Sequence, residues 1–133
     1  MARYLLDTNH LSPLVTLTHP LRAHILERLN QGDRFCIPVP ALTEMLYGIQ
    51  TLPRAQANVA EWARLKNSFV YYELDRDDAE AAALLQVQLR RRGRQLATVD
   101  ALIATVALRY RLPLLSTDGD FDTIPNLDRR NWL

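Results

Sequence analysis

Residues 3–9 of the chain read Arg-Tyr-Leu-Leu-Asp-Thr-Asn, and this stretch decides the class of fold. The apolar run over residues 4–6 is too short for a helix and ends abruptly in polar residues, which is typical of a buried strand. Asp7 is therefore expected at the carboxyl edge of a sheet, where open α/β proteins bind their ligands. Thr8 and Asn9 can cap a helix that follows.

Short apolar segments alternate with longer segments of helical periodicity along the rest of the chain. Strands are predicted over residues 4–6, 35–39, 69–74, 112–116 and 127–132, and helices over 9–16 (interrupted at Pro13), 20–31, 40–49, 53–67, 75–92 and 98–110. Thr98 is the expected N-cap of the last helix. This alternation predicts an α/β fold in which helices cover both faces of a mostly parallel sheet.

Length and composition predict one domain over residues 1–133, since 48% of the residues are hydrophobic and can form a core of their own. No apolar stretch approaches the ~20 residues of a membrane span and no secretory signal is evident, so a cytoplasmic protein is expected. Cys36 lies among apolar residues and is expected in the core. The spacing of His10, His19 and His24 suggests no zinc site, so they are expected to be solvated or to cap helices.

The balance of charge is close to neutral for the chain as a whole. Sixteen cations, fifteen of them arginines, oppose fifteen acids, which gives a net charge of +1. Setting aside Asp7, Glu44, Asp100 and Asp118 leaves eleven acids against the sixteen cations. An acidic pocket in a mildly basic surface suits a metal-dependent enzyme that acts on a polyanion.

Those four acids are expected to meet at the carboxyl edge of the sheet. Asp7, Glu44 and Asp118 each follow a predicted strand, and Asp100 lies in the first turn of a helix that can start at the same edge. Carboxylates brought together repel each other, so the cluster is costly unless a cation occupies it. Mg²⁺ and Mn²⁺ prefer oxygen ligands, and two such ions about 4 Å apart can promote in-line hydrolysis of a phosphodiester.

Each acid also has an ordinary structural explanation when it is considered alone. Asp7 can begin a turn after a strand, and Asp100 can interact with the positive end of a helix. Glu44 can be a solvated helix residue. Only their joint placement at one sheet edge favours a catalytic function.

A run of basic residues closes the helix predicted over residues 75–92. It comprises Arg90, Arg91, Arg92 and Arg94 around a glycine. Such a run is most often a solvated helix end. A flexible basic turn beside an acidic site can also hold RNA phosphates without reading the sequence of the RNA.

Four short blocks, taken in order, resemble the motif blocks of PIN-domain ribonucleases. They are Leu5-Leu6-Asp7-Thr8-Asn9, Leu42-Thr43-Glu44-Met45-Leu46-Tyr47-Gly48, Asp100-Ala101-Leu102-Ile103-Ala104 and Ser116-Thr117-Asp118-Gly119-Asp120-Phe121. Length and block order are similar to those of the VapC toxins of bacterial type II toxin–antitoxin systems over essentially the whole chain.

The resemblance implies a three-layer α/β/α sandwich and an Mg²⁺- or Mn²⁺-dependent endoribonuclease that cleaves structured RNA, either tRNA or ribosomal RNA. It also implies a homodimer and inhibition by a cognate antitoxin protein.

Carried over by position, the resemblance also implies a set of site residues. Asp7, Glu44, Asp100 and Asp118 would be the catalytic acids, and all of them except Glu44 would be metal ligands. The family varies between the positions of Asp118 and Asp120, so either can be the last ligand. The list of supporting residues is Thr8, Ser116 or Thr117, and Asp120.

Two other functions stay open. A phosphatase with Asp7 as its nucleophile needs a second aspartate two residues later, where Asn9 stands, and a lysine in a context that Lys66 does not match. A non-catalytic PIN-like module that binds RNA or a partner has no reason to keep four mutually repelling acids, although an acidic pocket can receive a partner's arginine. Metal-dependent turnover separates these functions from a nuclease.

Overall fold

The apolar segments of the sequence form the five strands of one sheet in the computed structural model, which describes residues 1–133. The strands are β1 (Arg3–Leu6), β2 (Arg34–Pro38), β3 (Val70–Tyr72), β4 (Leu114–Leu115) and β5 (Arg129–Arg130). The α-helices are α1 (Thr8–Leu11), α2 (Pro20–Asn30), α3 (Val39–Thr51), α4 (Ala55–Leu65), α5 (Arg76–Arg91) and α6 (Thr98–Tyr110). Three 3-10 helices complete the chain: η1 (Ser12–Val15), η2 (Lys66–Ser68) and η3 (Gly119–Thr123).

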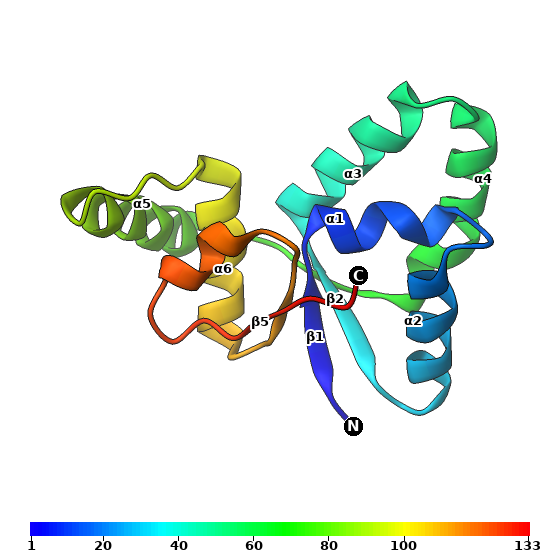
Figure 1. Ribbon diagram of the computed structural model, residues 1–133, viewed down its shortest axis with the longest axis horizontal. Coiled ribbons are helices and arrows are strands. Elements are labelled where there is room, and N and C mark those ends of the chain that lie inside the picture. The colour runs from blue at the N-terminus through cyan, green and yellow to red at the C-terminus, as the bar shows by residue number, and fades with distance from the viewer.

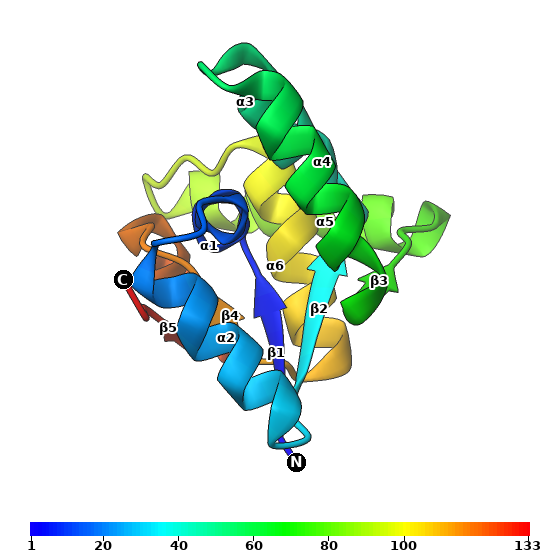
Figure 2. The same cartoon turned by 90° about the vertical axis from the view of Figure 1, so that its right-hand side faces the viewer.

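The sheet has the order β3-β2-β1-β4-β5, and every neighbouring pair is parallel. The chain first moves from β1 to β3, with α1–α4 on one face, and then returns to β4 through α5 and α6 on the other face (Figure 1). Right-handed crossovers require this change of face when the direction of travel reverses. The predicted three-layer α/β/α sandwich is therefore confirmed. Figure 2 shows β1 and β2 side by side and pointing the same way.

The central strands are buried on both faces, which explains why they are apolar without alternation. Leu5 and Leu6 of β1 and Phe35, Cys36 and Ile37 of β2 are all fully buried, so Cys36 has the core position expected of it. No helix combines the length and the apolarity that a membrane crossing needs.

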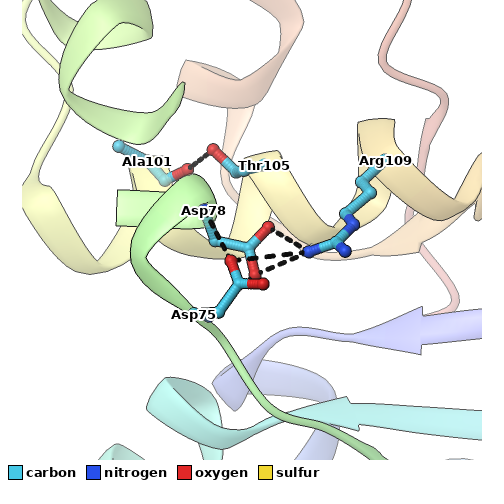
Figure 3. A network of polar contacts seen from close by, with 5 residues as sticks. All are labelled: Asp75, Asp78, Ala101, Thr105 and Arg109. Carbon is cyan, nitrogen blue, oxygen red and sulfur yellow. Dashed lines mark hydrogen bonds and ion pairs between the residues drawn. The ribbon is translucent and has the colours of Figure 1, made fainter. Parts of the chain in front are cut away.

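A polar network fastens α5 to α6 (Figure 3). Asp75 and Asp78 form a capping box at the start of α5. The guanidinium of Arg109 donates to both carboxylate oxygens of Asp78, at 2.9 and 3.0 Å. Within α6 the Thr105 hydroxyl donates to the Ala101 carbonyl at 2.8 Å. Asp78 is almost fully buried, and Arg109 balances its charge there.

Several predicted boundaries are wrong, for local physical reasons. Thr98 does not cap α6: it is the first helical residue, and the N-cap is Ala97, which has no side chain able to accept the bond. The interruption predicted at Pro13 is confirmed: the segment over 9–16 is divided into α1 and η1, because Pro13 lacks an N–H group. The predicted strands at 69–74, 112–116 and 127–132 shorten to three, two and two residues.

Candidate active site

The site begins where two parallel strands end side by side. Leu6 of β1 is paired with Leu115 of β4, so the next residues, Asp7 and Ser116, are also neighbours. The amide of Asp7 donates to the Leu115 carbonyl at 3.0 Å. The chain leaves β1 toward β2 and leaves β4 toward β5, in opposite directions across the sheet. Such a switch point opens a crevice at the carboxyl ends of the strands, where α/β proteins bind ligands.

Asp7 is held by three donors and is only 5% exposed. Its side chain accepts hydrogen bonds from the Thr8 amide at 2.8 Å, from the Ser116 hydroxyl at 2.6 Å and from the Asn9 amide group at 3.1 Å. Burial raises the pKa of Asp7, an effect that the Ser116 and Thr8 bonds oppose and the charges of Glu44 and Asp118 reinforce. The Asp7 carboxylate is thus held in one orientation by hydrogen bonds, and it forms no ion pair with an arginine or lysine.

Glu44 approaches from α3. It lies off the buried stripe of that helix and its side chain is exposed at the sheet edge. The Thr8 hydroxyl donates to Glu44 Oε1 at 2.9 Å, which joins α3 to the start of α1. Thr8, for which a supporting position was predicted, therefore contacts the Glu44 carboxylate.

Asp100 lies in the first turn of α6 and shares the electrostatic environment of the other acids. Its pKa is raised to about 6, first by burial and then by repulsion from Asp7, Asp118, Glu44 and Asp120. Charges influence one another's pKa in this way only at short range. The four acids that the sequence indicated therefore share one region of the structure.

Asp118 follows β4 and caps η3. Its amide donates to the Ser116 hydroxyl oxygen at 3.0 Å, and its side chain accepts from the Asp120 amide at 2.9 Å. Asp118 raises the pKa of both Asp7 and Asp100, whereas Asp120 acts on Asp100 alone and is more exposed. Of the two hydroxyl candidates, Ser116 contacts Asp7, while Thr117 contributes its backbone amide to Asn9 Oδ1 at 3.2 Å.

A buried chain of hydrogen bonds supports the site from behind, and the sequence did not reveal it. The Trp132 amide donates to His10 Nε2 at 3.1 Å, so the proton of the neutral ring is on Nδ1, which lies 2.7 Å from Asn9 Oδ1. Asn9 in turn donates to Asp7. His10 is fully buried, and burial lowers its pKa to about 4. The expectation that His10 is solvated or a helix cap is therefore wrong, although His19 does cap α2.

The donor set suits a hard divalent cation. All four acids offer only oxygen, and none of them is ion-paired with an arginine or lysine, whereas Asp33, Asp78 and Asp122 are. No three of the acidic, histidine or cysteine side chains converge closely enough to hold one ion directly. Mg²⁺ tolerates such a set, because it binds through one or two carboxylates and keeps several waters.

The basic run at the end of α5 remains free of acidic partners. Arg90, Arg91, Arg92 and Arg94 are all exposed, and none takes part in an ion pair. Gly93 among them has a φ of 74°, which reverses the chain after the helix.

Comparison with known proteins adds a family and a fold. The family model for the PIN domain matches residues 4–127. No curated protein matches the sequence.

Three solved structures illustrate the likeness of fold. VapBC2 from Rickettsia felis, bound to a DNA fragment of its promoter, has a TM-score of 0.84 at 22% identity over 98% of this chain and 99% of that chain. DNA-bound VapBC from Salmonella typhimurium has a TM-score of 0.83 at 24% identity over 100% of both chains. VapC20 of Mycobacterium tuberculosis, a sarcin–ricin loop cleaving toxin, has a TM-score of 0.65 at 20% identity over 90% of this chain and 93% of that chain.

Proposed function

We propose that this chain, which belongs to the PIN domain family, is a metal-dependent endoribonuclease of the VapC toxin type that hydrolyses phosphodiester bonds in structured cytoplasmic RNA. The observation that carries the proposal is the clustering of Asp7, Glu44, Asp100 and Asp118, none of which forms an ion pair with an arginine or lysine. In a domain that binds no cation at this position, the repulsion between the four carboxylates would only destabilise the fold.

The proposed division of labour follows the geometry of the side chains. Asp7, Asp100 and Asp118 would hold Mg²⁺ or Mn²⁺, and Glu44 would complete the catalytic acids. Bound ions would supply activation of water and stabilisation of the leaving oxygen, as in a two-metal site. Ser116 holds the Asp7 carboxylate in one orientation, and Thr8 does the same for Glu44. Asp118 is favoured over Asp120 as the last ligand, because the charge of Asp118 raises the pKa of both Asp7 and Asp100.

The partners proposed with this activity are an RNA substrate, a cognate antitoxin and a second copy of the chain. Two of the similar structures are VapBC complexes, which supports an antitoxin as the natural inhibitor. Another is a toxin that cleaves the sarcin–ricin loop, which supports RNA cleavage at a defined site. Sequencing the ends of the cleaved fragments would identify the substrate as tRNA or ribosomal RNA.

The proposal is tested by incubating purified protein with total cellular RNA and Mg²⁺ or Mn²⁺, beside EDTA and the Asp7→Asn variant. Asp77→Asn is the matched control, because Asp77 is an exposed acid outside the cluster and has no ion pair. Discrete fragments should appear with wild type and Asp77→Asn and be absent with EDTA and with Asp7→Asn. Equal cleavage by wild type and Asp7→Asn, or cleavage that survives EDTA, contradicts the proposal.

The same experiment addresses the two other functions. A non-catalytic module would bind RNA or a partner without turnover, and calorimetry would detect no Mn²⁺ binding. An aspartyl phosphatase needs a carboxylic acid at position 9, where the structure has the Asn9 amide donating to Asp7 and to Ser116. That position serves to fix the carboxylate of Asp7, which disfavours the phosphatase.

A further inference from the structure

A cavity lies outside the acidic cluster, and no acidic residue lines it. It measures about 700 Å³ and is formed by the last turns of α5 and the segment that leads to α6. Figure 1 shows this segment running back along α5 to the start of α6. The lining residues on which the argument depends are Ala83, Gln86, Val87, Arg90, Arg94 and Leu96.

We propose that this cavity binds one nucleotide of the RNA strand that the acidic cluster hydrolyses. The proposal rests on the proposed function, since it assigns a substrate contact to the same enzyme. It also assigns different functions to the four arginines of the basic run: Arg90 and Arg94 line the cavity and would contact the nucleotide, whereas Arg91 and Arg92 do not line it.

The two lining arginines provide the charge for a phosphate. Both are exposed, and neither has an acidic partner, although other arginines of the chain, such as Arg22, Arg28 and Arg129, are ion-paired. A guanidinium presents a planar fork of donors that matches phosphate oxygens in pairs. Arg90 lies in the last turn of the helix and Arg94 follows the reversal at Gly93, so the two guanidiniums reach the cavity from consecutive segments.

The remaining lining residues suit a nucleobase. Ala83, Val87 and Leu96 form an apolar surface on which a base can lie, and Val87 is 44% exposed there. Gln86 is held in place because its amide nitrogen donates to the Leu96 carbonyl at 2.9 Å and to the Thr98 hydroxyl at 3.3 Å. Its amide oxygen accepts no hydrogen bond from the protein, so it can accept one from an amino group of the base.

The cavity is joined directly to the catalytic segment. Gln86 bonds Thr98, the first residue of α6, and Asp100 follows two residues later in the same helical turn. Thr98 and Asp100 differ by about 3 Å along the helix axis and by about 200° around it, so the cavity and Asp100 flank the same first turn of α6 from different sides. An RNA strand that crosses this turn would have one nucleotide in the cavity and a phosphodiester further along at the acids. Phosphate contacts of this kind set the register of a strand without reading its sequence.

The test compares two double variants that remove the same charge from the same run. Arg90→Gln with Arg94→Gln removes the lining arginines, and Arg91→Gln with Arg92→Gln is the matched control. Binding of a fluorescein-labelled single-stranded RNA pentamer is measured by anisotropy in EDTA, on full-length protein carrying Asp7→Asn so that no cleavage interferes. The lining pair should weaken binding about tenfold or more, and the control pair by less than about threefold. Equal losses would show that the run acts only as general charge and would overturn the proposal.

A filling variant provides a test without any change of charge. Ala83 is exposed on α5, and Ala83→Trp would occupy the cavity. RNA binding should fall as in the lining pair, although the net charge of the protein is unchanged, because the base can no longer enter the cavity. Circular dichroism and the thermal midpoint establish that the variant folds. Wild-type RNA binding by a folded Ala83→Trp protein would overturn the proposal.

Failure of this proposal can be told apart from failure of the proposed function. If the lining pair binds and cleaves RNA like wild type, the cavity proposal fails and the nuclease stands. If RNA binding depends on the lining pair but wild type cleaves nothing with Mg²⁺ or Mn²⁺, the nuclease fails and the nucleotide site stands. Competition of the pentamer by an acidic peptide at the same concentration would assign the cavity to a protein partner and overturn the proposal.

Discussion

Replacing Asp100 by asparagine should stabilise the protein in the absence of metal and remove its response to metal. Asp100 has no cationic partner and is raised to a pKa of about 6 by burial and by the charges of Asp7, Asp118 and Glu44. The difference from 3.8 is worth roughly 3 kcal/mol at about 1.4 kcal/mol per tenfold change in proton affinity. Because Asp100 is only half-buried, solvent screens part of this, and we expect Asp100→Asn to add about 1–2 kcal/mol to the free energy of unfolding at pH 7.5.

The pH dependence of this gain has a definite sign. The folded protein holds the Asp100 proton more tightly than the unfolded chain, so wild type becomes relatively more stable as the pH falls from about 6 to about 4. The advantage of Asp100→Asn is therefore full above pH 6 and gone near pH 4.

Added Mn²⁺ should reverse the order of stability. A ligand at one hundred times its Kd stabilises the folded state by about 2.7 kcal/mol, and only wild type keeps all three proposed metal ligands. Urea unfolding followed by circular dichroism, in EDTA and in Mn²⁺ at pH 7.5, measures both effects, with Asp77→Asn as the exposed-acid control. The reasoning is refuted if Asp100→Asn is less stable than wild type in EDTA, or if Mn²⁺ stabilises both proteins equally.

Three further predictions concern the support of the site. Ser116→Ala removes the 2.6 Å bond to Asp7 and should cost about 1–2 kcal/mol in urea unfolding, and an unchanged midpoint would contradict this. Burial lowers the pKa of His10 to about 4, so between pH 6.5 and pH 4 only the unfolded chain takes up a proton at this residue. The stability advantage of wild type over His10→Gln in urea unfolding should therefore shrink by up to about 3 kcal/mol over this pH range. A difference that stays constant with pH would show that His10 is not buried as a neutral ring. Trp132→Ala removes an edge-to-face contact with Tyr4 at a centroid distance of 4.8 Å and should cost about 2 kcal/mol, which a loss below about 0.5 kcal/mol would refute.

The amino-acid sequence by itself determined the order of the elements and the class of fold, and it indicated the acids proposed for the site. The run at residues 4–6 needs burial on both faces, so it could only be a central strand. Once the strands are parallel, the handedness of the crossovers brings their carboxyl ends to one edge. Asp7 and Asp118 follow strands, so their meeting was already implied by the order of the chain. These properties are local or follow from chirality, which is why pattern alone predicted them.

Only the tertiary structure decided which side chains support the acids and where a second site lies. Trp132 and His10 are 122 positions apart, and their bond exists because the segment after β5 folds back beside β1. Thr98 was expected to cap its own helix, but its hydroxyl accepts from Gln86 on the neighbouring helix. Ser116 and Thr117 are equivalent by pattern, and the alternation of side chains at the end of β4 chose Ser116 to face Asp7. Such contacts join segments distant in the chain, and no periodicity or spacing along the sequence encodes their distances.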